Sequence, residues 1–133
     1  MSLLHHVSLE RRYAIAHADK RRVVYDPEII SINPTGVWIP HNVIVMEDGT
    51  LELGKHFHPY REMFFTPTGG FDFRLVDVDA PENKRSIQLD AGSRIVIPPR
   101  IAHKWVAKKG SVIIGFGDVP FDPSLMMPYE GPW

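Results

Sequence analysis

Residues 54–62 read Gly-Lys-His-Phe-His-Pro-Tyr-Arg-Glu, and this stretch brings two histidines and a glutamate close together in the chain. The residues around it favour strands, in which successive side chains alternate between two faces. His56, His58 and Glu62 are separated by even numbers, so an extended backbone predicts all three on one face. Pro59 interrupts the run, and we expect a bend or a strand end there because a central strand rarely holds proline.

A third histidine, His103, follows Pro-Pro-Arg-Ile-Ala at residues 98–102. Three imidazoles and a carboxylate form a donor set suited to a divalent transition metal of borderline softness. We therefore expect His56, His58, Glu62 and His103 to bind a metal ion where they meet in space. The ligand types do not choose among iron, manganese, nickel and zinc.

The composition limits the class of protein. A chain of 133 residues with 44% hydrophobic and 23% charged residues is long enough for one domain with one core. The net charge of -1 gives no reason to expect a nucleic-acid or membrane partner. Cysteine is absent, which excludes disulfides and thiolate chemistry. With no apolar run of about 20 residues and no signal-peptide core, we expect a cytoplasmic protein.

From residue 23 onward the pattern is that of short strands separated by turn signals rich in glycine, proline and aspartate. Such spacing is typical of an all-β sandwich or barrel. We expect an N-terminal arm over 1–22, a barrel over 23–118 and a C-terminal tail over 119–133. The predicted strands are 23–25, 29–33, 37–39, 42–47, 50–55, 63–67, 71–78, 85–89, 94–97, 104–107 and 112–116.

The two ends of the chain are less regular. Ser8 followed by Glu10 and good helix formers predicts a short helix over about 8–18, and the alternative is an arm that packs on a partner subunit. Residues 121–133 hold three prolines and are expected to form an ordered tail or a single helical turn.

The segment around His56 resembles the first motif of the cupin superfamily. That motif ends in H-x-H, three or four residues, E, six residues and G, and His56, His58, Glu62 and Gly69 match it.

The second cupin motif, G-x5-P-x-G-x2-H-x3-N, is matched by Gly92, Pro98 and His103. Arg100 replaces the motif's second glycine, and Ala107 stands where asparagine is usual. The resemblance implies a double-stranded β-helix, the jelly-roll barrel of cupins, with a metal inside its mouth. It also implies a homodimer that pairs through N-terminal strands.

A second likeness concerns one branch of this superfamily. Residues 94–105, 112–116 and 120–123 resemble the cupin-type keto-isomerases and epimerases of nucleotide sugars. In that branch the two histidines of H-x-H act as acid and base without a metal, and a carboxylate at the position of Glu62 is uncommon. Glu62 therefore favours a metal-binding cupin, whereas the tail favours a sugar-modifying one.

Three arginines are candidates for substrate binding: Arg61, Arg74 and Arg100. An arginine on the pocket side of the barrel would hold a carboxylate or phosphate bidentately. For Arg74 the alternative is a surface face shared with Asp72, and strand alternation points Arg61 away from the metal. His41 is expected on the surface, with a pocket role as the alternative.

These patterns lead to one main hypothesis and two alternatives. The main hypothesis is a metal-dependent enzyme that uses His56 and His58 on a polar, oxygen-rich small molecule in the barrel pocket, by oxygenase, isomerase or lyase chemistry. The first alternative is a metal-independent nucleotide-sugar keto-isomerase or epimerase with one of these histidines as base. The second is a cupin that binds a ligand without turnover.

Overall fold

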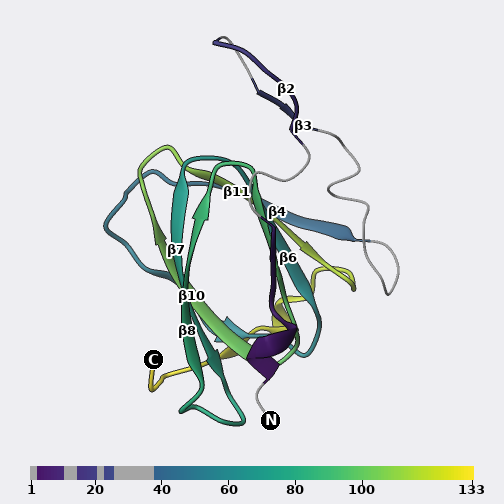
Figure 1. Cartoon of the computed structure of the whole chain (residues 1–133). Coiled ribbons are helices and arrows are strands. Elements are labelled where there is room, and N and C mark those ends of the chain that lie inside the picture. Colours follow the sequence, from purple (N-terminus) through teal and green to yellow (C-terminus); the bar gives the residue numbers. More distant parts are fainter. Residues whose placement is uncertain (1–2, 11–14, 21–22, 26–37) are drawn as a thin grey trace.

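The computed structural model describes residues 3–10, 15–20, 23–25 and 38–133. Within these residues nearly all regular structure is β (Figure 1). The predicted strand at 29–33 and Val37 lie outside the described residues. The strands predicted at 37–39 and 42–47 form one continuous strand, Ile39–Val45, and the remaining predicted strands are present with their ends shifted by a few residues.

Two five-stranded sheets, in which every pairing is antiparallel, make up the body of the fold. In the order of its strands, the first sheet consists of β1 (Ser8–Glu10), β9 (Ser93–Ile97), β6 (Glu62–Thr68), β11 (Val112–Gly117) and β4 (Ile39–Val45). The second sheet consists of β12 (Met127–Pro128), β5 (Leu53–Phe57), β10 (Ile101–Ala107), β7 (Gly70–Asp77) and β8 (Lys84–Asp90).

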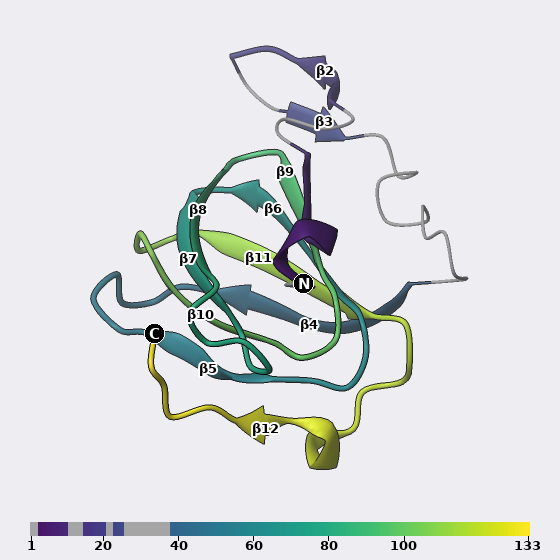
Figure 2. The ribbon, with the colours of Figure 1, turned by 60° about the horizontal axis from the view of Figure 1, so that its bottom comes forward.

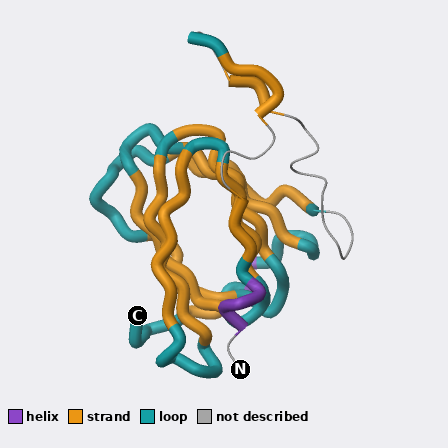
Figure 3. Tube along the Cα trace, viewed as in Figure 1, coloured by secondary structure: helices purple, strands orange, loops and turns teal. Residues whose placement is uncertain are grey.

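The two sheets curve around one another and enclose the core, as the tube in Figure 3 shows. This is the jelly-roll barrel of the cupin fold that the sequence predicted. Alternating residues of each strand point inward, so that Phe71, Phe73 and Leu75 of β7 are fully buried together with Ile95 of β9. Burial of these large side chains is the main stabilising contribution.

The helix predicted over 8–18 is wrong. Ser8–Glu10 forms β1 along the edge of β9, and Ile15–Ala18 (β2) pairs with Val23–Tyr25 (β3). Pairing with neighbouring strands outweighs the helix propensity of this segment. The helical turn η1 lies earlier, at Leu3–His6. Among the described residues β2 and β3 pair only with each other. The arm boundary at residue 22 and the homodimer stay predictions.

The C-terminal tail returns along the barrel, as Figure 2 shows beneath β5. It contains the predicted single helical turn, η3 (Pro123–Leu125), and then β12, which pairs with β5. The tail therefore contributes a strand to the second sheet, which the sequence did not predict. No helix among the described residues has the length and apolar character needed to cross a membrane.

Candidate functional site

Adjacent strands of the second sheet bring His56 and His103 together. His103 of β10 lies directly opposite His56 of β5, at a point where the pairing register shifts after His103. Gly54 makes this approach possible because its φ of +93° suits glycine, and a Cβ there would lie 2.7 Å from the carbonyl oxygen of His103. The local backbone is thus adapted to bring the two imidazoles side by side.

His58 and Glu62 reach the site by a different route from the one that alternation predicted. β5 ends at Phe57, so the bend expected near Pro59 is confirmed and His58 lies just beyond the strand. Glu62 is the first residue of β6 in the opposite sheet. The expectation that all three side chains share one face of one strand is wrong, because the chain crosses between the sheets after Pro59.

All four predicted ligands nevertheless converge. The candidate ligand atoms of His56, His58 and His103 lie within 4.8 Å of one another. Glu62 Oε1 lies 3.3 Å from Nε2 of His58 and 3.3 Å from Nε2 of His103. His103 is completely buried, and His58 and Glu62 are nearly so. Half-buried His56 is the most accessible of the four.

Backbone carbonyls fix the tautomers of two imidazoles. Nδ1 of His58 lies 3.2 Å from the carbonyl oxygen of Leu125, and Nδ1 of His103 lies 3.2 Å from that of Ile101. A carbonyl oxygen only accepts, so both Nδ1 atoms carry the hydrogen and donate it. In the neutral rings both Nε2 atoms are then acceptors, and they face the same oxygen of Glu62.

Burial dominates the electrostatics. It raises the pKa of Glu62 well above its ordinary value and lowers the pKa of His103 well below its own. Burial, and then the neighbouring His56, lower the pKa of His58 to about 4. Burial also lowers the pKa of His56. Burial therefore favours neutral imidazoles and a protonated Glu62, whose Oε1 lies near both Nε2 atoms.

The donor set also fits a divalent cation. Ligand atoms about 2.1 Å from one ion lie about 3.0–3.5 Å apart, which the two 3.3 Å separations match. Among the described residues, buried Nε2 of His103 has no hydrogen-bond partner, although Glu62 Oε1 is close. Backbone carbonyls that orient ligating imidazoles are the usual outer partners at such sites. The four residues can hold a metal, whose presence stays a prediction.

The site opens into a cavity of about 250 Å³. His56, His58 and Glu62 form one wall, with Phe64 and Trp105 of the core beside them. Of the residues that the structure describes, no lysine or arginine lines this cavity. Its walls are therefore mainly apolar, with a few converging polar groups, as in small-molecule sites.

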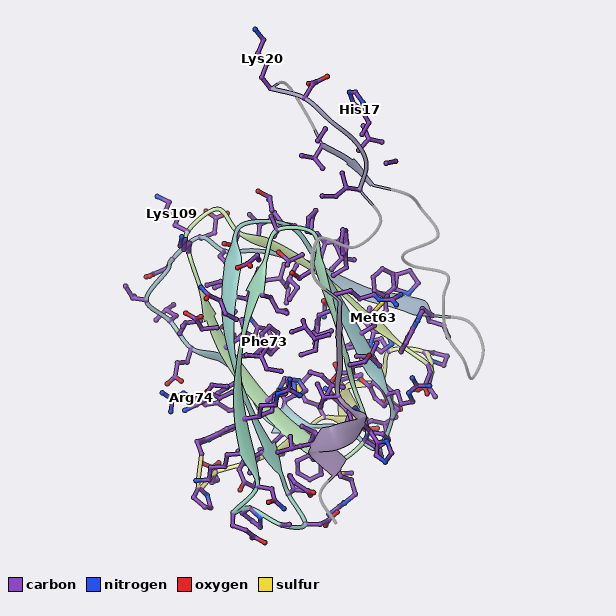
Figure 4. The ribbon with its side chains drawn as sticks, viewed as in Figure 1. His17, Lys20, Met63, Phe73, Arg74 and Lys109 are labelled. Carbon is purple, nitrogen blue, oxygen red and sulfur yellow. The ribbon has the colours of Figure 1, made fainter. Side chains whose placement is uncertain are left out.

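The three predicted substrate-binding arginines lie elsewhere. Arg74 points away from the barrel while Phe73 points into it (Figure 4). Arg74 and Asp72 are both exposed, as the alternative of a shared surface face predicted. Arg100 makes a bidentate ion pair with Asp79 at the surface. The guanidinium of Arg61 lies over the ring of Trp38, 5.6 Å from its centroid. Their roles in substrate binding stay predictions, and none of them lines the cavity.

The cavity is also lined by residues that were not predicted as site residues, among them His41, Tyr60, Phe121 and Met126. Tyr60 is buried and stacks on His58, with ring centroids 4.7 Å apart. Burial, followed by nearby carboxylates, raises the pKa of Tyr60, which keeps its proton at neutral pH. His41, which was expected on the surface with a pocket role as the alternative, is half-buried and lines the cavity, because the pairing of β4 with β11 brings it to the mouth.

No protein-family model matches the chain, and comparison with curated proteins gives no significant match. Solved structures do resemble it. A sugar 3,4-ketoisomerase from Thermoanaerobacterium thermosaccharolyticum in complex with TDP gives a TM-score of 0.76 at 20% identity, over 96% of this chain and 90% of that one. A mutant of that enzyme has been solved with TDP-4-keto-6-deoxyglucose.

Two further enzymes share the architecture. The TDP-quinovose 3,4-ketoisomerase from Campylobacter jejuni gives a TM-score of 0.70 at 17% identity, over 91% of each chain. The dTDP-4-dehydrorhamnose 3,5-epimerase from Bacillus anthracis, with TDP and PPi bound, gives 0.67 at 16% identity, over 96% of this chain and 84% of that one. These likenesses establish the cupin jelly-roll fold, in the form found in sugar ketoisomerases and epimerases.

Proposed function

We propose that this protein isomerises or epimerises a keto sugar carried on a nucleoside diphosphate, by acid–base chemistry in the histidine-lined cavity. The observation that carries the proposal is the convergence of neutral His56 and His58 with protonated Tyr60 in one small cavity. The architecture shared with sugar ketoisomerases and epimerases supports it. The hypothesis of a metal-dependent enzyme becomes the second candidate.

The chemistry requires one base and one acid and no oxidant. A base removes the proton from the carbon beside the carbonyl, the C–H electrons form the enol double bond, and the acid protonates the carbonyl oxygen. For a ketoisomerase, the neighbouring hydroxyl of the enediol then loses its proton while the former carbonyl carbon gains one. For an epimerase, the first carbon regains a proton on its opposite face while the enol hydroxyl returns its proton to the acid and becomes the carbonyl again.

The structure suggests which residues take these roles. His56 is assigned as the base because it is the most accessible of the three clustered imidazoles and burial lowers its pKa, which favours the neutral form. Tyr60 is assigned as the acid because its raised pKa preserves the phenolic proton. His58 lies between them, 4.8 Å from the ring centroid of His56 and 4.7 Å from that of Tyr60.

The test is turnover of TDP-4-keto-6-deoxyglucose in the presence of a chelator, followed by proton NMR. We expect transfer of the carbonyl group or inversion of an adjacent carbon, and a loss of about 10²–10⁴-fold in kcat/KM for His56→Asn. The matched control is His17→Asn, because His17 is exposed and is a residue of β2, outside both barrel sheets. Absence of turnover by the wild type across 4-keto nucleotide sugars would contradict the proposal.

A metal-dependent enzyme is the second candidate, and a specific observation favours it. Two acceptor nitrogens and a carboxyl oxygen meet at 3.3 Å in a buried site. A cation bound there by His56, His58, Glu62 and His103 would act as a Lewis acid on a substrate oxygen. Elemental mass spectrometry of untagged protein tests this candidate: about one metal per chain, lost in His58→Ala and retained in His17→Asn, would favour it over the first.

A further inference from the structure

The segment that follows β11, residues 118–126, crosses the mouth of the cavity and is here called the strap. Most of its residues are exposed, and η3 within it buries no side chain. The strap is therefore held in place by hydrogen bonds more than by core packing.

Two cavity histidines supply hydrogen bonds at opposite ends of the strap. Nε2 of His41 donates to the carbonyl oxygen of Val119 at 2.7 Å, and Nδ1 of His58 donates to that of Leu125 at 3.2 Å. Each acceptor is a backbone carbonyl, so each imidazole must be the donor. The strap is thus tied to the side chains that line the cavity beneath it.

The position of His41 is closely defined. A Cβ on Gly117 would overlap the His41 ring, so the imidazole occupies space that a side chain at this position would fill. The ring meets Tyr60 edge-on at 5.6 Å on one side and Phe121 edge-on at 5.6 Å on the other. His41 therefore connects the proposed acid with the strap.

Two strap residues, Phe121 and Met126, line the cavity, and Phe121 supplies the aromatic ring. The side chain of Phe121 is 50% exposed, so its ring is accessible to a ligand. A pyranose ring presents a face made only of C–H groups, and the electron-rich face of an aromatic ring attracts such groups. The cavity has a volume of about 250 Å³, and none of the described lysines or arginines lines it. It therefore suits an uncharged sugar ring and leaves the charged diphosphate outside.

We propose that His41 is a positioning residue that holds the strap across the mouth, so that Phe121 packs on the apolar face of a single pyranose ring inside the cavity. The assignment of the ring rests on the proposed function, whereas the positioning by His41 stands on the geometry alone. The strap then determines which sugars fit, and His56 and Tyr60 act on the ring that it admits.

The first test needs no ligand. In His41→Phe the ring is kept and the donor is lost, and His41→Gln restores a donor. We expect about tenfold faster hydrogen exchange at the amides of Leu125 and Met126 in His41→Phe, wild-type exchange in His41→Gln, and no change in β10. These two amides report on the strap because they donate to Asp122 and Pro123 within η3. Unchanged strap exchange in His41→Phe would overturn the positioning role.

The second test measures ligand selection with TDP-4-keto-6-deoxyglucose. Phe121→Ala and His41→Phe are expected to raise KM about tenfold with kcat within about twofold, and His41→Gln to return KM to the wild-type value. An unchanged KM in Phe121→Ala would overturn the packing on the sugar ring. If the wild type neither binds nor converts this compound, the proposed function and the selection role fail together, and the exchange experiment still decides the positioning role.

Discussion

The second sheet presents two faces that differ in chemistry although they share the same strands. On the inner face His103, Trp105 and Phe73 are buried beside the histidine cavity. On the outer face Arg74 is exposed and Lys104 pairs with Glu52 at 3.1 Å. Glu52, Arg74 and Lys104 help to line a groove on this face, here called the outer groove. Its volume of about 650 Å³ exceeds the 250 Å³ of the histidine cavity.

The pKa values of two glutamates show the physical consequence of this difference. A hydrogen bond from Lys104 lowers the pKa of exposed Glu52, whereas burial raises the pKa of Glu62. Solvation favours the charged form of the outer carboxyl group, and burial favours the protonated form of the inner one. Desolvation, more than pocket size, therefore distinguishes the titratable groups of the two faces.

The largest difference is expected between adjacent residues of β7. Phe73→Ala removes a fully buried ring and should lower the free energy of unfolding by about 3–5 kcal/mol. Arg74→Ala removes an exposed side chain and should change it by less than about 0.5 kcal/mol. Urea denaturation measures both variants, and similar losses in the two would contradict the assignment of the two faces.

The second prediction concerns the pH dependence of the chelator-treated protein. Because the folded pKa of Glu62 lies above its unfolded value, the folded state keeps a proton that the unfolded state has lost. The stability of the wild type relative to Glu62→Gln should therefore fall as the pH rises above about 4.5, by up to about 1.4 kcal/mol per pH unit.

Unfolding free energies measured between pH 5 and 8 test this prediction. His58 and His103, whose pKa values are lowered, give an opposite trend below pH 6.5, and the comparison with Glu62→Gln removes most of it. If the unfolding free energy of the wild type rose with pH relative to that of Glu62→Gln, Glu62 would be charged in the folded protein.

A smaller effect is expected at Arg100, which has a φ of +65° where the cupin motif has glycine. Both Arg100→Gly and Arg100→Ala lose the ion pair with Asp79, so they differ mainly in the backbone. The glycine variant should be more stable than the alanine variant by about 1 kcal/mol, as measured by thermal unfolding. Equal stabilities would show that the left-handed conformation relaxes without cost.

The smallest effect is expected from Glu52→Gln on the outer face. An exposed ion pair contributes little, so the unfolding midpoint should stay within error and kcat/KM within about twofold of the wild type. Phe121→Ala, on the cavity side, is the matched comparison for activity. A large loss of activity in Glu52→Gln would move the functional surface to the outer groove.

Much of the barrel could be predicted from the sequence because turn residues separate its strands and inward positions alternate with outward ones. The histidine motifs likewise predicted the meeting of His56, His58 and His103. Glu62 joined them from the opposite sheet, which strand alternation could not show. The N-terminal helix failed because β1 gains its partner, β9, from more than eighty residues away.

The histidine motifs did not place His41 or Phe121 in the cavity, although a pocket role for His41 was an alternative and residues 120–123 belonged to the likeness with sugar keto-isomerases. His41 comes to the mouth through the pairing of β4 with β11, and Phe121 through the return of the tail along β5. Both depend on contacts between distant parts of the chain, which local patterns do not encode. A histidine after a proline and an exposed phenylalanine in a tail carry little signal by themselves.

The most direct test of the central claim is proton NMR of TDP-4-keto-6-deoxyglucose incubated in D2O with the chelator-treated protein. Acid–base catalysis in the cavity predicts deuterium at the carbon beside the carbonyl, at a rate that falls at least about 100-fold in His56→Asn and stays unchanged in His17→Asn. Incorporation that appears only after a divalent metal is restored, or that survives in His56→Asn, would contradict the claim.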